Sequence, residues 1–442
     1  AIPRIIDAAK RCGAEAIHPG YGFLSENADF AEAVEVAGLT LVGPPASAMR
    51  MMGSKTTARV AAGKVGAPVV PGTTSALASV DDARVVAARV GYPIMLKASG
   101  GGGGKGLREV RTEQELESAF SMASSEAASS FKDSALYVEK YIDRPRHIEI
   151  QLIGDRFGNM VYLGERECSL QRRHQKVMEE CPSPVVDSDL RRRMGETAIL
   201  IARAAGYWNA GTIEFLVDQE RNFYFLEMNT RLQVEHPVTE LVSGRDLVHE
   251  QIRVAAGQPL SFTQDEVTLR GHAIECRIYA EDPDTGFLPI PGRITGLSTP
   301  SGPGVRNDTG IYKGWEVPVH YDPMLAKLAV WAETREEAVN RLARALGEYT
   351  IEGVKTSLNF FRSVVLDEDF ISGSFDTGYI DRFLARWRDH GSAVGETDAC
   401  LADLAVIAAV LDSRSRSSDP GRRRSRPESK WKTYGAGGWR QY

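Results

Sequence analysis

The stretch from Gly211 to Asn229, GTIEFLVDQERNFYFLEMN, holds two apolar runs with a polar segment between them. The runs Gly211–Val217 and Phe223–Asn229 contain the aromatic and β-branched residues that are enriched in strands. The segment Asp218–Asn222 has the composition of a short turn. The stretch therefore predicts an antiparallel β-hairpin.

Three side chains of this hairpin offer oxygen ligands. Residues two apart in a strand share a face, so Glu227 and Asn229 project together and Glu214 can lie opposite them. Two carboxylates on one half-buried face repel each other unless a cation lies between them. Carboxylate and amide oxygens suit Mg²⁺ or Mn²⁺, and substrate phosphates can complete the coordination shell. The hairpin therefore predicts a metal site at Glu214, Glu227 and Asn229.

The polar alternation continues beyond the hairpin. Arg231, Gln233 and Glu235 extend the same register, with apolar residues between them. A polar strand face turned to solvent is the alternative interpretation, but five successive odd positions make a denser polar run than a surface strand needs. We therefore expect one extended strand from Phe223 to Glu235, in which a metal site is followed by an anion site.

The flanking sequence predicts the rest of this sheet and the helices that cover it. From residue 147 onward the hydrophobic pattern has period two, which is typical of antiparallel strands. The expected strands are His147–Ile153 and Met160–Leu163, followed by a strand-rich section from Gly271 to about Trp331, and the expected helices are Ser188–Ala205, Asp246–Ala256 and Arg335–Glu348.

The N-terminal part has a different organisation. Helices at Ile2–Arg11 and Asn27–Ala37 alternate with strands at Ala14–His18 and Leu39–Val42, which predicts an α/β unit with a parallel sheet. A compact unit of helices and strands follows from Pro68 to Tyr141. The predicted fold class is therefore α/β, and α+β overall.

The C-terminal segment Ser413–Lys430 carries six arginines among serine, proline and glycine, with almost nothing to bury. This composition predicts disorder. A nucleic-acid-binding tail is the alternative, but a solvated linker is the more frequent meaning of such a segment.

A run of five glycines, Gly100–Gly104, lies between the expected strands Ile94–Ala98 and Arg108–Val110. Such a loop exposes backbone N–H groups to phosphate oxygens, and Lys97 and Lys105 add positive charge. A P-loop would need glycine at position 99 and serine or threonine at 106, whereas serine and glycine stand there. The dinucleotide fingerprint would open a helix, not a strand. A linker does not belong inside a strand pair, so the run predicts a flap over a triphosphate.

The basic run Gln171–Lys176, QRRHQK, is either an exposed basic turn or part of an anion site. An exposed basic turn is the more frequent structure for such a run. Lys176, Arg231 and Arg277 form an anion site only if the fold brings them together, which periodicity cannot show. His147 is either a functional residue or simply the first residue of a strand, and the sequence favours neither interpretation.

The composition restricts the function classes. The chain has 442 residues and a net charge of -6, whereas general nucleic-acid binders usually have a basic excess. Its five cysteines are scattered without a C-x-x-C pair, which favours reduced thiols over disulfides or zinc. No uncharged apolar run reaches the roughly 18 residues that a membrane span needs. These features predict a cytoplasmic protein that binds neither nucleic acid nor membranes.

Several motifs together resemble the biotin carboxylase family of the ATP-grasp superfamily. They are His18–Asn27 (HPGYGFLSEN), Lys97–Ser99 through Lys105–Gly106, Glu139–Tyr141 with Pro145–His147, Gln171–Lys176, Glu227–Glu240 (EMNTRLQVEHPVTE), and Glu275–Arg277 with Ala280–Pro283. The similarity extends from Ala1 to about Trp387, and the run Asn229–Pro237 is highly specific for the family.

The resemblance implies an ATP-grasp fold with a partial N-terminal parallel α/β (Rossmann-like) domain, a small lid domain and a C-terminal antiparallel-sheet domain. The implied ranges are 1–67 for the N-terminal domain with linker helices, 68–141 for the lid, 142–387 for the ATP-grasp core and C-terminal domain, and 388–442 for a helix and a disordered basic tail. The family's opening strand with its Asn-Arg-Gly-Glu turn does not precede Ala1, so we expect a chain that begins within the N-terminal domain.

The implied reaction is the ATP-dependent carboxylation of biotin by bicarbonate through carboxyphosphate. It is the first half-reaction of an acyl-CoA carboxylase, and acetyl-CoA carboxylase is the expected type. The implied cofactors are ATP and two Mg²⁺ or Mn²⁺ ions. No Met-Lys-Met biotinylation site occurs, so biotin is expected on a biotin carboxyl carrier protein, and the further partners are a second copy of the chain and a carboxyltransferase subunit. Another ATP-grasp ligase, such as a carbamoyl-phosphate synthetase-like enzyme, and a non-catalytic remnant are the alternatives.

The resemblance also assigns roles to individual residues. The residues implied to bind ATP are Lys55, Lys97, Gly103, Gly104, Glu139, Lys140, His147, Gln171, His174, Glu214 and Glu227. The implied metal ligands are Glu214, Glu227 and Asn229. The residues implied to bind bicarbonate are Lys176, Arg231, Gln233 and Val234. Glu235 would be the base that deprotonates bicarbonate, and Arg277 would stabilise the biotin enolate, with Tyr21 near the biotin entrance. The implied catalytic residues are therefore Lys176, Arg231, Glu235 and Arg277.

Overall fold

The computed structural model describes residues 1–73, 75–98, 107–131, 135–391, 406–408 and 410. Residues 1–382 form one unit and residues 383–442 a second. Helix α13 (Tyr379–Gly391) crosses this boundary. The predicted disordered segment 413–430 and the glycine run 100–104 lie outside the described residues. None of the helices within the described ranges is long and apolar enough to cross a membrane.

The first segment alternates helices and short strands. Its elements are α1 (Ile2–Arg11), β1 (Ala16–Ile17), α2 (Ala28–Val36), β2 (Thr40–Leu41), α3 (Ala46–Gly53) and α4 (Lys55–Lys64). Strands β1 and β2 pair in parallel, as the alternating pattern predicts, although each is only two residues long. The Asn27 side chain caps α2 by accepting a hydrogen bond from the Phe30 amide at 2.7 Å.

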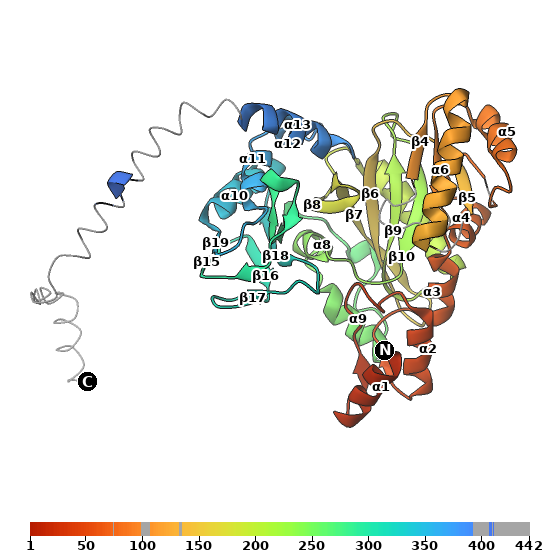
Figure 1. Cartoon of the computed structure of the whole chain (residues 1–442). Helices are drawn as coiled ribbons and strands as arrows, with labels where there is room; N and C mark the ends of the chain where they lie inside the picture. The colour runs from red at the N-terminus through yellow and green to blue at the C-terminus, as the bar shows by residue number, and fades with distance from the viewer. Residues whose placement is uncertain (74, 99–106, 132–134, 392–405, 409, 411–442) are drawn as a thin grey trace, which may run out of the picture. The chain divides into compact units, whose positions relative to one another are not determined.

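A small antiparallel sheet with two helices follows, at the right of Figure 1. Its strands are β3 (Ile94–Ala98), β4 (Leu107–Val110) and β5 (Leu136–Lys140), in the order β4-β3-β5, and its helices are α5 (Val80–Val90) and α6 (Glu113–Phe131). Ile94 and Leu96 of the central strand are fully buried against Ala83 of α5 and Leu116 of α6. The unit therefore has a hydrophobic core of its own.

The main sheet has eight strands in the order β10-β9-β6-β7-β8-β11-β18-β16, and all neighbours are antiparallel. The strands are β6 (Arg146–Gly154), β7 (Met160–Arg172), β8 (Gln175–Cys181), β9 (Asn209–Val217), β10 (Phe223–Asn229), β11 (His272–Tyr279), β16 (Val305–Thr309) and β18 (Met324–Ala332). The predicted hairpin is present as β9 and β10. It lies at one edge of the sheet, and the strand-rich section after Gly271 completes the other (Figure 1).

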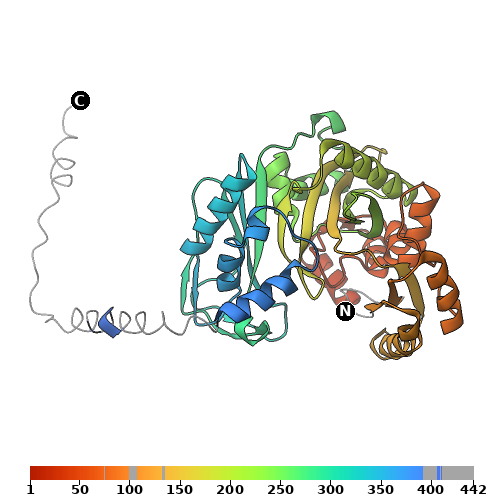
Figure 2. The same cartoon turned by 90° about the horizontal axis from the view of Figure 1, so that it is seen from above.

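Helices cover this sheet at both ends. α7 (Ser188–Ala204) packs against β6 and β7, and α10 (Arg335–Glu348) packs against β11 and β18. In the view from above, α7 is the yellow-green helix and α10 the teal one (Figure 2). The remaining elements are α8 (His236–Ser243), α9 (Leu247–Ala255), α11 (Leu358–Val364), α12 (Glu368–Ile371) and the short strands β12 (Glu281–Asp282), β13 (Leu288–Pro289), β14 (Gly292–Arg293), β15 (Gly296–Ser298), β17 (Glu316–Val317) and β19 (Thr350–Glu352).

The prediction of one strand from Phe223 to Glu235 was wrong. β10 ends at Asn229, and Glu235 is the N-cap of helix α8. Pro237 in the first turn of α8 favours the start of a helix, because its fixed backbone suits that position and it has no N–H to lose. The polar alternation therefore spans two different elements joined by a loop.

The extent of β7 was also underestimated. The sequence predicts a strand at Met160–Leu163, whereas β7 continues to Arg172 and forms a hairpin with β8. Nearly every side chain of β7 is buried, so the period-two pattern that signals a strand is missing. Arg173 and His174 form the turn, both with positive φ, and Gln171 pairs with Lys176 across it. The basic run is therefore the end of a hairpin, with its turn at Arg173 and His174.

A β-bulge sets the register of the β9–β10 hairpin. Phe225 pairs with Phe215 and Glu227 with Glu214, so one extra residue, Leu226, lies between the two pairs on β10. Paired residues of antiparallel strands share a face, so the bulge places Glu227 on the same face as Glu214.

Candidate active site

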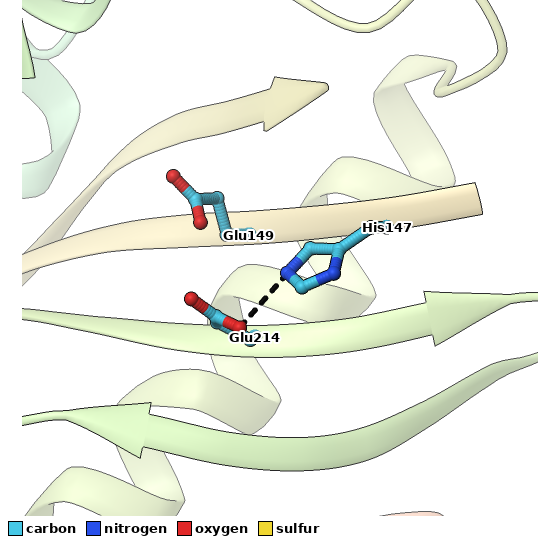
Figure 3. A group of neighbouring side chains, drawn as sticks. All are labelled: His147, Glu149 and Glu214. Atoms are coloured by element: carbon cyan, nitrogen blue, oxygen red, sulfur yellow. Dashed lines mark ion pairs between the residues drawn. The ribbon is translucent and has the colours of Figure 1, made fainter. Parts of the chain in front are cut away.

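A row of four charged residues crosses the main sheet. Arg166 of β7 pairs with Glu149 of β6, Glu149 pairs with Glu214 of β9, and Glu214 pairs with Glu227 of β10. Their side chains therefore lie on one face of the sheet. Figure 3 shows His147 and Glu149 on β6 with Glu214 on the neighbouring strand, and the His147 ring pointing at Glu214.

Lys176 of β8 is the cation that holds three of the carboxylates together. Its ammonium contacts Glu149, Glu214 (Nζ–Oε1, 2.9 Å) and Glu235 (Nζ–Oε1, 2.8 Å). Burial alone would lower the pKa of Lys176, but the three carboxylates outweigh it and hold the pKa well above its ordinary value. Lys176 therefore remains charged, with its side chain 12% exposed toward the cavity described below.

Glu235 lies where α8 begins and is 2% exposed. One oxygen accepts from Lys176 and the other from Arg277 (Nη2–Oε2, 2.8 Å). Burial raises the pKa of Glu235, but Lys176, Arg277 and Arg166 lower it well below its ordinary value. Glu235 is therefore ionised, with a cation on each of its two oxygens.

Arg277 of β11 is held between two carboxylates. Its Nε donates to Glu179 Oε1 at 2.7 Å, and its Nη2 donates to Glu235. Burial lowers the pKa of Arg277, but Glu179 and Glu235 outweigh it and keep the guanidinium charged. Burial also raises the pKa of Glu179 to about 7. The planar guanidinium is thereby fixed in direction at the cavity wall.

Glu214 is the centre of the predicted metal site. It accepts hydrogen bonds from Asn229 (Nδ2–Oε1, 2.8 Å) and Gln233 (Nε2–Oε1, 2.9 Å) and forms an ion pair with His147 (Nε2–Oε2, 2.8 Å). Burial raises the pKa of Glu214, but Lys176 and His147 outweigh it and hold the pKa far below its ordinary value. Glu214 and Glu227 supply paired carboxylates of the kind that Mg²⁺ and Mn²⁺ prefer, whereas the Asn229 amide directs its nitrogen at Glu214 and its oxygen accepts from Arg231.

The loop between β10 and α8 carries the predicted anion-binding residues. Arg231 donates to Asn229 Oδ1 (Nη2, 3.0 Å) and to Glu26 Oε2 (Nε, 3.0 Å). The Val234 carbonyl accepts from Lys327 Nζ at 3.0 Å. Arg231, Gln233, Val234, Lys176, Glu235 and Arg277 line one cavity of about 400 Å³ with the metal-site residues.

The predicted nucleotide-binding residues line an adjoining cavity of about 440 Å³. It is lined by Lys97, Glu139, Lys140, His147, Gln171 and His174, all of which except Lys140 also line the first cavity. Lys97 and Arg59 form ion pairs with Glu139, and Gln171 Nε2 lies 3.0 Å from His147 Nδ1. The two cavities therefore form one continuous depression.

Five of the predicted residues lie elsewhere, point elsewhere or cannot be placed. Tyr21 is not among the residues that line either cavity, but the ammonium of Lys327 lies 6.0 Å from its ring centroid. Lys140 directs its ammonium at the carbonyls of Gly91 and Tyr92, both at 3.0 Å. Gly103 and Gly104 lie outside the described residues. Lys55 begins α4, and its side chain is not described.

The sequence interpretation missed several residues of this network, namely Glu26, Arg59, Glu149, Arg166, Glu179 and Lys327. Glu149 stands two residues after His147 on an expected strand, so the sequence could have predicted that both side chains lie on one face. Arg166 stands between Glu165 and Glu167, and three consecutive charged residues could also have indicated a site.

His236, which follows Glu235, gives a pH prediction. It is 6% exposed, and burial lowers its pKa to about 3. The unfolded chain takes up a proton below about pH 6.5 and the folded chain does not, so acidification destabilises the fold by about 1.4 kcal/mol per pH unit through this group. This loss begins near pH 6.5 and ends near the folded pKa. The His236→Asn variant keeps a donor for the Gln233 carbonyl and should show a smaller loss between about pH 6.5 and pH 5 in urea unfolding. Equal acid slopes for the two proteins would contradict this role.

Three family models match consecutive parts of the chain. They are the biotin carboxylase N-terminal domain at residues 1–49, the carbamoyl-phosphate synthase L chain ATP-binding domain at 54–263, and the biotin carboxylase C-terminal domain at 275–382. Together they extend across both cavities and the main sheet.

Relatives and solved structures agree with these matches. A biotin carboxylase of Nostoc sp. is 50% identical over 379 residues, which cover 86% of this chain and 85% of the relative. A pyruvate carboxylase subunit of Methanothermobacter thermautotrophicus is 51% identical over 382 residues, which cover 86% and 78%. The structure of a Campylobacter jejuni biotin carboxylase in complex with a β,γ-ATP compound has 49% identity and a TM-score of 0.83, and covers 86% of this chain and 85% of that one. The chain therefore belongs to the biotin carboxylase family and has its ATP-grasp fold.

Proposed function

We propose that this chain uses ATP and bicarbonate to carboxylate biotin. The observation that carries the proposal is the position of Glu235, with Lys176 on one carboxylate oxygen and Arg277 on the other, in a cavity that Arg231 and Gln233 also line. An ionised carboxylate that lines the same cavity as an anion-binding loop is placed to receive the proton of a bicarbonate bound there.

In the proposed mechanism, ATP binds in the cavity lined by Lys97, Glu139, His147, Gln171 and His174, with Lys55, Lys140, Gly103 and Gly104 as further contacts. Glu214, Glu227 and Asn229 would hold two Mg²⁺ or Mn²⁺ ions, which neutralise phosphate charge when bound. Support comes from a solved biotin carboxylase domain of a Hydrogenobacter thermophilus 2-oxoglutarate carboxylase, which is 45% identical with a TM-score of 0.83 and covers 86% of this chain and 84% of that one. That structure is a dimer in complex with MgADP, ADP and bicarbonate.

The chemistry then follows from the residues around the second cavity. Lys176, Arg231, Gln233 and the Val234 backbone bind bicarbonate, and Glu235 removes its proton. The resulting carbonate attacks the γ-phosphorus of ATP, which gives carboxyphosphate and ADP. Carboxyphosphate breaks down to CO₂ and phosphate, and the phosphate takes the ureido proton of biotin. Arg277 stabilises the enolate that attacks CO₂, and Tyr21 would contact biotin as it enters.

We further propose that biotin arrives on a biotin carboxyl carrier protein, that a carboxyltransferase subunit takes the carboxyl group, and that the chain acts as a homodimer. Acetyl-CoA is the proposed final acceptor, as in fatty acid biosynthesis. Relatives are named for pyruvate, propionyl-CoA and methylcrotonoyl-CoA as well, so the transferase that co-purifies with the protein decides the acceptor.

An ATP hydrolysis assay tests the central proposal. Hydrolysis should require bicarbonate and increase with free biotin. Stimulation by ammonia in place of biotin would instead support a carbamoyl-phosphate synthetase-like ligase, which the ATP-binding family model also describes. A protein that binds MgATP without any turnover would support the non-catalytic alternative.

The Arg277→Ala variant should separate the two half-steps. Bicarbonate-dependent ATP hydrolysis should survive, whereas carboxybiotin formation should fall about 10²–10³-fold, because the enolate loses its charged partner. The exposed Arg293, whose Nε contacts the Gly314 carbonyl, is a matched control, and Arg293→Ala should change neither rate. Equal loss of both activities in Arg277→Ala would contradict the enolate role.

A further inference from the structure

Arg166 is a fully buried arginine beneath the proposed bicarbonate site. It lies on β7 with 0% exposure, in the register row that continues through Glu149 and Glu214. Its guanidinium donates to five side chains, namely Glu149 (Nε–Oε1, 2.5 Å), Gln151 (Nη1–Oε1, 2.6 Å), Thr239 (Nη1–Oγ1, 3.0 Å), Thr212 (Nη2–Oγ1, 3.1 Å) and Gln233 (Nη2–Oε1, 2.6 Å). Each of its three nitrogens therefore has at least one acceptor.

Core packing alone gives no reason for a charge at this position. A buried ion pair is often replaced by apolar residues of similar volume without loss of stability, because the charges must first be desolvated. Two of the five contacts of Arg166 lead to the reactive cavity: Gln233 lines that cavity, and Glu149 is the partner of Lys176. These contacts suggest a role in the reaction.

The contact with Gln233 determines which end of the amide faces the substrate. A guanidinium has only donors, so the amide atom 2.6 Å from Nη2 must be the oxygen. The amide nitrogen is then directed the other way, where it donates to Glu214 Oε1 at 2.9 Å, and both Gln233 and Glu214 line the cavity. An anion such as bicarbonate needs donors, and the reversed amide would present an oxygen to it instead.

The contact with Glu149 acts on Lys176. Glu149 Oε1 accepts from Arg166 and Oε2 from Lys176, so Arg166 neutralises part of the Glu149 charge. Glu149 therefore weakens the attraction between Lys176 and a substrate anion less than it would without Arg166. Both effects make the cavity wall a better donor to an anion.

We propose that Arg166 is a positioning residue for bicarbonate, because it fixes the Gln233 amide with its nitrogen toward the cavity and balances Glu149 behind Lys176. This proposal rests on the proposed function. It predicts that changes at Arg166 act mainly on the KM for bicarbonate and much less on the KM for MgATP.

A double-mutant cycle with Arg166→Lys and Gln233→Ala tests the proposal. A lysine keeps the charge but replaces with one nitrogen the separate nitrogens that contact Glu149 and Gln233. Each single variant should raise the bicarbonate KM about tenfold, and the double variant should resemble the single ones, since both changes remove the same oriented donor. The KM for MgATP should stay within about twofold of wild type. Multiplicative effects on the bicarbonate KM, or an unchanged KM in Arg166→Lys, would overturn the proposal.

Thr239→Val is the matched control. It removes one hydrogen bond of Arg166 on α8, away from Gln233 and Glu149, and should lower the melting temperature without changing the bicarbonate KM. If Arg166→Lys does not fold, Arg166→Met with Glu149→Met removes both buried charges together and should still raise the bicarbonate KM, because the Gln233 amide loses the contact that orients it. An unchanged KM in that pair would also overturn the proposal. A wild-type protein without bicarbonate-dependent hydrolysis contradicts the proposed function itself, which distinguishes the two failures.

Discussion

The Glu235→Gln variant is expected to lose bicarbonate-dependent ATP turnover by about 10²–10⁴-fold, the usual effect of removing a positioned general base. The amide keeps the shape of the carboxylate, and its oxygen can still accept from Lys176 or Arg277. MgATP binding measured by calorimetry should be little changed, because Glu235 does not line the nucleotide cavity. The loss should therefore appear in kcat and not in nucleotide affinity.

Glu240→Gln is the control for this experiment. Glu240 lies on the same helix with its side chain 10% exposed, but it contacts Arg306 and the Leu247 amide instead of the reactive cluster. Its turnover should stay close to that of wild type. A Glu235→Gln variant with near wild-type turnover would refute the base role, whatever the control shows.

The Lys176→Met variant is expected to be both inactive and destabilised at neutral pH. Removal of the ammonium leaves Glu149, Glu214 and Glu235 without their shared cation, and breaking a buried ion pair costs about 3–5 kcal/mol. The pKa values of Glu214 and Glu235, which Lys176 lowers in the wild type, should rise in the variant. The folded variant would then take up protons at a higher pH than the unfolded chain. Its stability relative to wild type should therefore recover as the pH falls toward about 5.

Urea unfolding across this pH range, together with the hydrolysis assay, measures both effects. Lys355→Met is a matched control, because Lys355 also contacts two carboxylates, Asp282 and Asp284, but its side chain is 60% exposed. An exposed pair contributes about 0–1 kcal/mol, so this variant should unfold almost like wild type. A pH-independent destabilisation of Lys176→Met would show that packing and not charge is responsible.

The sequence was sufficient for the parts of the site that lie on one hairpin. The period-two pattern predicts β9 and β10, and the spacing of Glu214, Glu227 and Asn229 predicts that they share a face. These are local features, set by the alternation of side chains along a strand. The parallel pairing of β1 with β2 follows in the same way from the alternation of helices and strands.

The remaining parts depend on contacts between distant segments. Lys176 and Glu235 are 59 residues apart and meet only because the sheet brings β8 close to the start of α8. The alternation after Asn229 predicted a strand for Glu235, because a loop and a helix N-terminus happened to continue the same polar spacing. Arg166 lies in a strand that is buried throughout, where hydrophobic periodicity carries no signal. Only the family resemblance suggested in advance that Lys176, Glu235 and Arg277 act together.

The bulge at Leu226 determines which single-residue deletions preserve the pairing of β9 with β10. Phe225 pairs with Phe215 in the apolar core, and Glu227 pairs with Glu214 on the opposite face, so Leu226 has no partner of its own. Loss of the Leu226 codon would leave both pairs in place and restore regular alternation. Loss of the Met228 codon would instead set Asn229 against Ile213 and turn it from the catalytic face into the core. A gap at Leu226 would therefore preserve the two pairs but remove a side chain that lines both cavities, whereas a gap at Met228 would break the register.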